Sequence, residues 1–438
     1  MQRIRIAERA QRRARTEEAG FRFHTIDGRP YWDERAYYAF TLRQIEQDIE
    51  DLSAELHQMA LDLVGDVIGS ERLMDQLAIP PAFRDWIADS WRQRQPHLYG
   101  RLDLAYDGTG PAKLYELNYD TPTSLFEASF FQWQWLEDQR NAGRLPQHAD
   151  QFNGMHEMLV ERFGELAARL PPPLYFSAVG ASEEDRGTVE CLRDCAAQAG
   201  LHGQPITIED IGLSEDGRFT ALDDAVIGTL FKLYPLEDLM AEEFGRALPG
   251  SGVQLLEPAW KAVLSNKGIL PLLWQRNPGH PNLLEAHFDE GHALAAGWVR
   301  KPLLSREGAN IEMRLADGST QRSDGPYDGP AIIQRAHPLT RFDGCYPLIG
   351  SWVIGDSACG IGICEGDRAI SMTPMVVPAA GRQPHEPSVG GLRLPANGRH
   401  YPSTALVGGG NSTTPAFPIC GFGWRNHRHS RPSRFTAR

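Results

Sequence analysis

The sequence has no apolar run of about 18 residues, the length that a membrane-spanning helix needs. The basic N-terminal segment has no apolar stretch after it, so we predict no secretory signal. The six cysteines lack metal-binding spacing, and Cys191 and Cys195 are predicted to be small buried side chains on one helix. These absences predict a protein of the reducing cytoplasm that has no membrane partner.

Positive charge is also scarce. Lys and Arg number 44 against 57 Asp and Glu, and the net charge of −13 argues against a nucleic-acid partner. The 438 residues, 41% of them hydrophobic, are enough for a large globular core. A strand at 174–180, a helix at 183–200 and a strand at 205–212 indicate an α/β protein, and the sequence after 256 has mixed α+β character.

Further elements are predicted on the N-terminal side. Residues 21–35 read as an aromatic hairpin that turns at Asp27 and Gly28. Apolar residues at helical spacing predict a long helix around 45–63, and further helices are predicted at 80–95, 124–139 and 154–169.

The composition changes at Gly366. Residues 366–438 contain nine arginines, no lysine and two acidic residues, and they show no helix or strand periodicity. This composition is typical of a disordered segment or of a coding sequence translated out of frame. We therefore divide the chain into a folded region, residues 1–365, and a divergent tail, residues 366–438.

The most informative stretch runs from Arg101 to Ser124. We predict a hairpin in which Asp103 on one strand faces Glu116 and Asn118 on the other, beside Arg101. Two carboxylates and an amide oxygen suit Mg²⁺, and an adjacent arginine can hold a phosphate or carboxylate bidentately. The pattern indicates phosphoryl transfer from a Mg-nucleotide such as ATP.

Two lysines support this interpretation. Lys301 stands at the end of a predicted strand before a small-residue loop, KPLLSREGAN, which is a geometry that can contact phosphate. Lys267 precedes it by 34 residues, and the P-loop pattern is missing. Without the hairpin, two surface lysines and a turn would explain these residues. Gln334 ends an apolar strand that could meet an adenine edge, although on this pattern alone an ordinary strand end is the favoured explanation.

Several passages between residues 18 and 365 together resemble the glutathionylspermidine synthase family, and most closely its stand-alone acid–amine ligases that lack an amidase domain. They include HTIDGRPYWDERAYY, GRLDLAYDGTG, LNYDTPTSLFEASFFQWQWLEDQ, EEDRGTVE, EPAWKAVLSNKGILPLLW, KPLLSREGAN and GSWVIGDSACGIGI. The resemblance implies an ATP-grasp fold with a preceding pre-ATP-grasp α/β region. It also implies an ATP-dependent ligase that joins an acid, such as a glutathione-like peptide, to an amine, such as a polyamine, through an acyl phosphate.

The resemblance also implies roles for particular residues. The Mg²⁺ positions match Asp103, Glu116 and Asn118, and Arg101 matches the residue that stabilises charge on the transferred phosphoryl group. The remaining assignments follow the same matching passages: ATP contacts at Lys267, Lys301, Gly308 and Gln334, acid contacts at Thr121 and Thr123, and an acidic patch for the amine at Glu183 and Glu184.

Two other hypotheses stay open at this point. Members of the resembled family carry an arginine where this chain has Cys364, so the chain could bind ATP, or hydrolyse it weakly, without ligating. A hydrolase built on the Asp103 and Glu116 carboxylates would leave Asn118 and the two lysines without a role.

Overall fold

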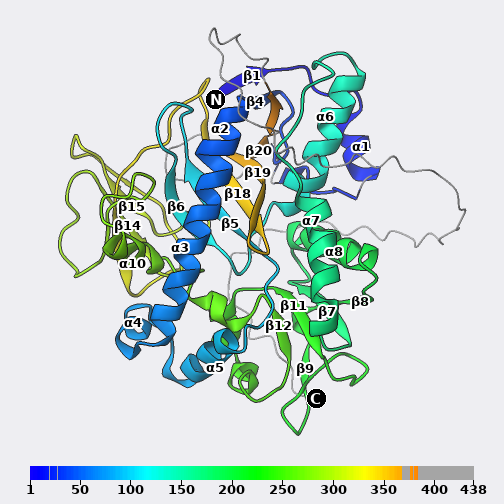
Figure 1. Cartoon of the computed structure of the whole chain (residues 1–438), viewed down its shortest axis with the longest axis vertical. Helices are drawn as coiled ribbons and strands as arrows, with labels where there is room; N and C mark the ends of the chain where they lie inside the picture. The colour runs from blue at the N-terminus through cyan, green and yellow to red at the C-terminus, as the bar shows by residue number, and fades with distance from the viewer. Residues whose placement is uncertain (19, 27, 367–374, 378, 383–438) are drawn as a thin grey trace, which may run out of the picture. The chain divides into compact units, whose positions relative to one another are not determined.

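A computed structural model of the chain describes residues 1–18, 20–26, 28–366, 375–377 and 379–382. Its central element is an antiparallel sheet with the strand order β20-β19-β18-β5-β6 (Figure 1). The strands are β5 (Tyr99–Ala105), β6 (Lys113–Asn118), β18 (Tyr346–Ile354), β19 (Ser357–Gly366) and β20 (Met375–Val377).

The hairpin predicted from the sequence is β5 and β6. Its register pairs Arg101 with Asn118 and Asp103 with Glu116, and an irregularity follows Asp103. Because side chains alternate between the two faces of a strand, these four polar groups share one face. Leu102 and Leu117 pair on the opposite face, where they join the largest hydrophobic cluster of the molecule.

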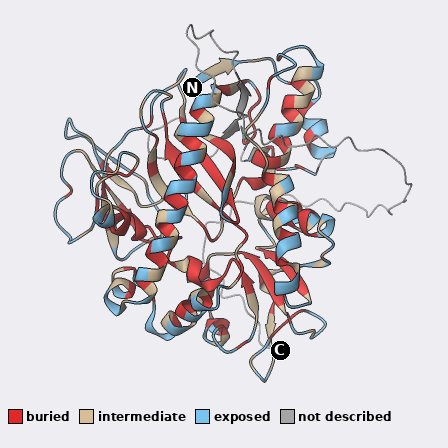
Figure 2. Ribbon diagram, in the orientation of Figure 1, coloured by how far each residue is buried: buried red, intermediate tan, exposed pale blue. Residues whose placement is uncertain are grey.

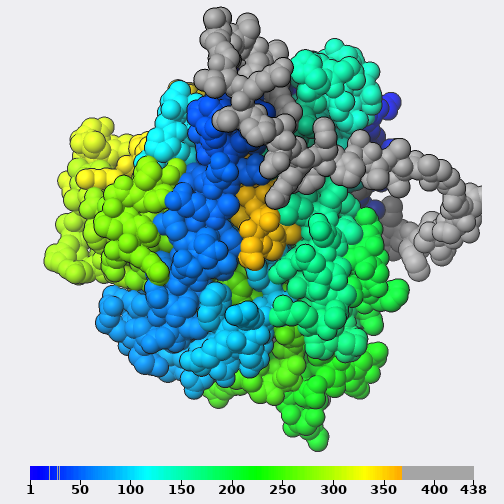
Figure 3. Space-filling view, in the orientation of Figure 1, coloured from blue at the N-terminus to red at the C-terminus, as the bar shows by residue number. Residues whose placement is uncertain are grey.

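A continuous helical stretch runs across the central sheet (Figure 1). It consists of α2 (Leu42–Ile45), the π-helical turn η1 (Glu46–Glu50) and α3 (Asp51–Ile68), and Thr41 and Gln44 form a capping box at its start. Its apolar stripe is buried while the opposite side is exposed (Figure 2), which confirms the predicted long helix. Figure 3 shows that the end of the β18–β19 hairpin reaches the surface between α3 and the helix of residues 155–166.

A second sheet is parallel, with the order β12-β11-β7-β8. Helix α8 connects two of its strands, and Ser182 caps that helix by accepting a hydrogen bond from Asp185 N. Helix α7 packs beside α8 (Figure 1), and Cys191 and Cys195 are buried on α8 as predicted. The elements are α7 (Met155–Leu166), β7 (Leu174–Ala178), α8 (Glu183–Gln198), β8 (Gly203–Thr207), β11 (Thr229–Leu233) and β12 (Gln254–Leu256).

A third, antiparallel sheet has the order β13-β17-β14-β15-β16 and lies beside helix α10. It carries Lys301 on β14 and Gln334 on β17. Its elements are α10 (Ile269–Arg276), β13 (Ala286–Phe288), β14 (Trp298–Pro302), β15 (Glu312–Arg314), β16 (Thr320–Arg322) and β17 (Ala331–Arg335).

The other elements connect and flank these sheets. The predicted aromatic hairpin is present as β2 and β3, and strand β1 pairs with β4. The bounds are β1 (Gln2–Arg5), α1 (Arg12–Glu18), β2 (Thr25–Ile26), β3 (Arg29–Pro30), β4 (Ala36–Phe40), α4 (Glu71–Gln76), α5 (Pro81–Arg92), η2 (Glu127–Phe131), α6 (Gln132–Asn141), η3 (Ala167–Arg169), η4 (Ile208–Asp210), β9 (Gly212–Leu213), β10 (Phe219–Thr220), α9 (Leu236–Ala241), η5 (Glu243–Ala247), η6 (Ala259–Ala262) and β21 (Ala379–Arg382).

Two short strands correct the prediction that residues 366–438 lack regular structure. Strand β20 pairs with β19 and strand β21 pairs with β4, so the chain after Gly366 adds a strand to each of two sheets. Backbone hydrogen bonds to an open sheet edge form whatever the side chains are, which explains why composition did not indicate them. Residues 367–374, 378 and 383–438 lie outside the described residues, and the prediction for them stays a prediction.

Within the described ranges, no helix combines the length and the apolar character that crossing a bilayer requires. The five cysteines among these residues, Cys191, Cys195, Cys345, Cys359 and Cys364, are free thiols.

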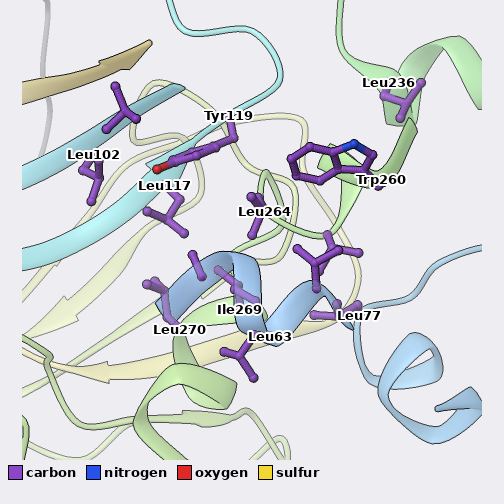
Figure 4. Close-up of a cluster of buried hydrophobic side chains, with 14 of the residues drawn as sticks. Leu63, Leu77, Leu102, Leu117, Tyr119, Leu236, Trp260, Leu264, Ile269 and Leu270 are labelled. Atoms are coloured by element: carbon purple, nitrogen blue, oxygen red, sulfur yellow. The ribbon is translucent and has the colours of Figure 1, made fainter. Parts of the chain in front are cut away.

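The main hydrophobic cluster lies under the β5–β6 hairpin. Figure 4 shows Leu102 and Leu117 from the hairpin above Leu63 of α3 and Ile269 and Leu270 of α10. The cluster therefore ties the central sheet, the long helix and the third sheet's helix to one apolar core. Burying one such leucine stabilises the fold by roughly 1.5–3 kcal/mol.

Leu102→Ala is expected to lower the free energy of unfolding by about 2–5 kcal/mol, because Leu102 is fully buried and the truncation leaves a cavity. Chemical denaturation measures this change. Leu222→Ala is the matched control, since Leu222 is 58% exposed and should change the free energy by no more than about 0.5 kcal/mol. Equal effects of the two substitutions would contradict the placement of Leu102 in the core.

Candidate active site

The site is built around the buried carboxylate of Asp103. Arg101 donates from Nε and Nη2 to its two oxygens at 2.7 and 3.1 Å, and Asn118 Nδ2 donates to Oδ2 at 2.8 Å. Arg101 Nη1 also donates to the backbone oxygen of Thr123 at 2.8 Å, which fixes the loop after β6. Burial raises the pKa of Asp103, and the charge of Arg101 opposes that rise. The hairpin thus brings Arg101, Asp103 and Asn118 together as predicted.

Glu116 completes the acidic side of the site and is held by lysines. Its carboxylate lies 3.1 Å from Lys267 Nζ. Burial alone would raise its pKa, but Lys267 and Lys301 lower the pKa of Glu116 to about 2, so this group is a carboxylate at neutral pH. Burial lowers the pKa of Lys301 to about 8, with Glu116 opposing the shift. Two lysines from distant segments therefore meet the hairpin, as the sequence predicted.

Gln334 is the penultimate residue of strand β17. Strand β17 continues to Arg335 and is bonded on both sides, to β13 and to β14. The backbone of Gln334 therefore belongs to the sheet, and its predicted contact with the adenine edge stays a prediction. Its buried side chain instead accepts a hydrogen bond from Lys301 Nζ at 2.8 Å. A hydrophobic run alone does not reveal where pairing stops.

The loop between β14 and β15 closes one side of the site. Lys267 Nζ donates to the backbone oxygen of Ser305, and Gly308 adopts a φ of +70° that favours glycine. Arg306 links this loop to two other segments, since its Nη1 donates to Thr121 Oγ1 at 2.7 Å and its Nη2 donates to Glu237 at 2.6 Å. Sequence reasoning missed Arg306, although it stands inside the SREGAN segment already singled out.

The predicted acidic patch is divided by the structure. Glu184 accepts a hydrogen bond from Tyr31 OH at 2.7 Å, and the same hydroxyl lies 3.3 Å from Ser124 Oγ, so Glu184 faces the site. Glu183 is half-exposed, and its charged partner is Arg186 at 3.8 Å, so it stays at the surface end of α8. Only one of the two predicted glutamates is brought to the site.

Two further residues interact with the charge of Arg101. Glu127 is fully buried in the turn η2, within the helix predicted at 124–139, where the sequence gave no signal for a functional carboxylate. Cys364 lines a cavity of about 20 Å³ together with Arg101, Asp103 and Ser124. Burial raises the pKa of the Cys364 thiol to about 12, so this position contributes no charge at neutral pH.

The side chains present fit a magnesium ion and a nucleoside triphosphate. Among the described residues, no three His, Cys, Asp or Glu side chains converge on a metal position. A cation at this site would therefore have two carboxylates, Asp103 and Glu116, and would need an amide oxygen as its third protein ligand. Asn118 bonds Asp103 through its nitrogen, and that bond does not use its oxygen. An all-oxygen donor set suits Mg²⁺, and Arg101, Lys267 and Lys301 supply positive charge for phosphates.

Comparison with known proteins places the chain in a family. A family model described as "Glutathionylspermidine synthase preATP-grasp" matches residues 3–378. The chain belongs to this family. The match reaches 13 residues past residue 365, the predicted end of the folded region, and ends beside β20.

Relatives in this family share most of the chain. A protein of Haemophilus influenzae named "Putative acid--amine ligase" is 41% identical over 80% of this chain and 92% of that protein. The trypanothione synthetase of Crithidia fasciculata is 27% identical over 72% of this chain, and the bifunctional glutathionylspermidine synthetase/amidase of Escherichia coli is 24% identical over 77%. The chain spans only 52% and 58% of the lengths of these two larger proteins.

A solved structure supports the fold. The glutathione synthetase-like effector from Globodera pallida superposes with a TM-score of 0.51 at 12% identity, covering 78% of this chain and 88% of that one. The mixed α/β, ATP-grasp type of fold predicted for this family is thereby confirmed. Family membership also confirms the predicted enzyme class, a carbon–nitrogen ligase.

Proposed function

We propose that the chain is an ATP-dependent acid–amine ligase that makes an amide through an acyl-phosphate intermediate. The acid would be a glutathione-like peptide and the amine a polyamine. The observation that carries the proposal is the convergence of Arg101, Asp103, Asn118, Glu116 and Lys267 at one end of a single hairpin. Such a site offers positioning and charge neutralisation, which are the main requirements of phosphoryl transfer.

The residues divide into three groups in this proposal. Asp103, Glu116 and Asn118 would hold Mg²⁺, which would neutralise phosphate charge when bound. Lys267, Lys301 and Gly308 would contact the ATP phosphates, Gln334 would orient Lys301 near the nucleotide, and Arg101 would stabilise charge on the transferred phosphoryl group. Thr121 and Thr123 would position the acid, and Glu184, with Glu183 nearer the surface, would attract the amine.

The charges around the two carboxylates support a ligase over a carboxylate-dyad hydrolase. A dyad needs one carboxyl group that carries a proton at working pH. Glu116, with its pKa lowered to about 2 by Lys267 and Lys301 against the effect of burial, could only be the ionised member of such a dyad, and a dyad would give Lys267, Lys301 and Asn118 no part in the reaction.

Mg²⁺-dependent ADP release by the purified chain tests the proposal. The assay supplies ATP with a panel of glutathione-like acids and polyamines, each alone and in pairs. Release that rises only with a matched acid and amine, together with an amide product detected by mass spectrometry, is expected.

Two results would contradict the ligase proposal. ATP binding with no substrate-stimulated release would indicate a degenerate ATP-binding relative, for which the neutral Cys364 beside Arg101 would be the first explanation to examine. Hydrolysis of an amide without ATP would indicate the dyad mechanism instead.

A further inference from the structure

Glu127 is a buried carboxylate that has no hydrogen-bond partner. Its side chain is fully buried, and neither of its two oxygens has a hydrogen-bond partner, although the Tyr31 hydroxyl is close enough to lower its pKa. Leaving a carboxylate unpaired in the interior costs several kcal/mol relative to water, so such a group is kept neutral or awaits a cation. It therefore differs from the buried Glu257, which is paired with Lys261.

The groups that face Glu127 come from several elements. Burial raises the pKa of Glu127, the charge of Glu184 on α8 raises it further, and the charge of Arg101 on β5 lowers it. The pKa of Glu127 therefore reaches about 8. The Tyr31 hydroxyl and the Cys364 thiol of β19 also interact with its charge. Burial, with the charges of Asp185 and Glu307 adding to it, raises the pKa of Glu184 to about 7. The charge of Glu184 thus acts on Glu127, and the charge of Arg101 acts on both carboxyl groups.

We propose that Glu127 receives the ammonium group of the amine substrate and takes one of its protons before the amine attacks. The inference rests on the proposed ligase function and names the residue that would prepare the nucleophile. A cation is the ligand that would satisfy two adjoining carboxyl groups, whereas an acid or a phosphate would be repelled by them.

The position of Glu127 agrees with this role. The Arg101 guanidinium donates to the Asp103 carboxylate, and its charge also acts on Glu127, so an amine held at Glu127 would be near the residue proposed to stabilise the transferred phosphoryl group. The cavity of about 20 Å³ beside Arg101, Ser124 and Cys364 has room for a group the size of a water molecule or an ammonium. The Tyr31 hydroxyl, shared by Ser124 and Glu184, adjoins the same place.

The proposed step conserves atoms and charge. The arriving ammonium favours the ionised form of Glu127, so the carboxyl group first releases its proton to water. One N–H bond of the ammonium then breaks and its proton passes to a Glu127 oxygen, which leaves a neutral amine. The nitrogen lone pair then forms the C–N bond at the acyl carbon, and the bond from that carbon to the phosphate oxygen breaks. Inorganic phosphate leaves with the electron pair, and the second proton lost from nitrogen goes to the departing phosphate or to water.

Glu127→Gln in the full chain tests the inference, with glutathione as the acid and two nucleophiles compared. Spermidine is charged at neutral pH and needs a base, whereas hydroxylamine is largely uncharged and does not. At pH 7 the variant is expected to lose about a hundredfold of spermidine-dependent ADP release and to keep hydroxylamine-dependent release. Raising the pH should restore part of the spermidine reaction, because free amine becomes available. Glu137→Gln, on the neighbouring helix and paired with Arg140, is the matched control and should change neither reaction.

The outcomes separate the two proposals. If the unmodified chain releases ADP with neither nucleophile, the ligase function fails and the inference falls with it. If Glu127→Gln keeps the spermidine reaction and its pH profile, or loses both reactions equally, the ligase stands and the role of Glu127 is wrong. If circular dichroism shows that Glu127→Gln is unfolded, Glu184→Gln takes its place. Removing the Glu184 charge should shift the acid limb of the spermidine profile to lower pH, and an unshifted limb would overturn the inference.

Discussion

Asp103→Ala is expected to lower Mg²⁺-dependent ATP turnover by at least about 10³-fold while the fold stays intact. The substitution removes a proposed metal ligand and also releases Arg101 and Asn118, which both donate to this carboxylate. Losing one preorganised electrostatic contact typically costs between about 10² and 10³ in rate, and here two contacts lose their anchor at once. Steady-state ADP release at saturating ATP measures the effect, and thermal unfolding checks the fold.

Asp107→Ala is the control for the same hairpin. Asp107 accepts hydrogen bonds from the Thr109 and Gly110 backbone in the exposed turn, so its loss should cost a small amount of stability and leave turnover unchanged. If Asp103→Ala retained turnover within tenfold of the unmodified chain, Asp103 would have no place in the reaction. If both variants lost turnover equally, the effect would belong to the hairpin fold.

Arg101→Lys is expected to lower the rate by between about 10² and 10³-fold, which is roughly 2.7–4 kcal/mol of transition-state stabilisation. Arg101 uses three N–H groups at once, two on Asp103 and one on the Thr123 backbone oxygen, in the plane of one guanidinium. A lysine ammonium is a point charge that cannot reproduce this fork. The rate at saturating substrates, measured beside the binding constant for ATP, separates lost catalysis from lost binding.

Arg84→Lys provides the comparison for Arg101. Arg84 also contacts two carboxylates, Glu71 and Asp75, but these are exposed and lie outside the site. Surface ion pairs are worth about 0–1 kcal/mol, so this variant should keep full turnover. An Arg101→Lys variant as active as Arg84→Lys would remove Arg101 from the phosphoryl-transfer step.

Local sequence was enough to predict the centre of the site. The hairpin places Arg101 and Asp103 opposite Asn118 and Glu116 because strand alternation and antiparallel pairing are set within 18 residues of chain. The same argument succeeded for the long helix of residues 42–68, whose apolar stripe is a local periodicity. Motif resemblance then indicated the family that the match over residues 3–378 shows.

Contacts between distant segments could not be predicted in this way. The sequence determined by itself the α/β class, the hairpin and the main helices, since each depends on neighbours within a few residues. Only the tertiary structure decided that Gln334 is held inside a sheet by Lys301, that Glu184 and not Glu183 faces the site, and that Glu127 is buried without a partner. These facts depend on which segments pack together, and burial and pairing are properties of the whole folded chain that no local pattern specifies.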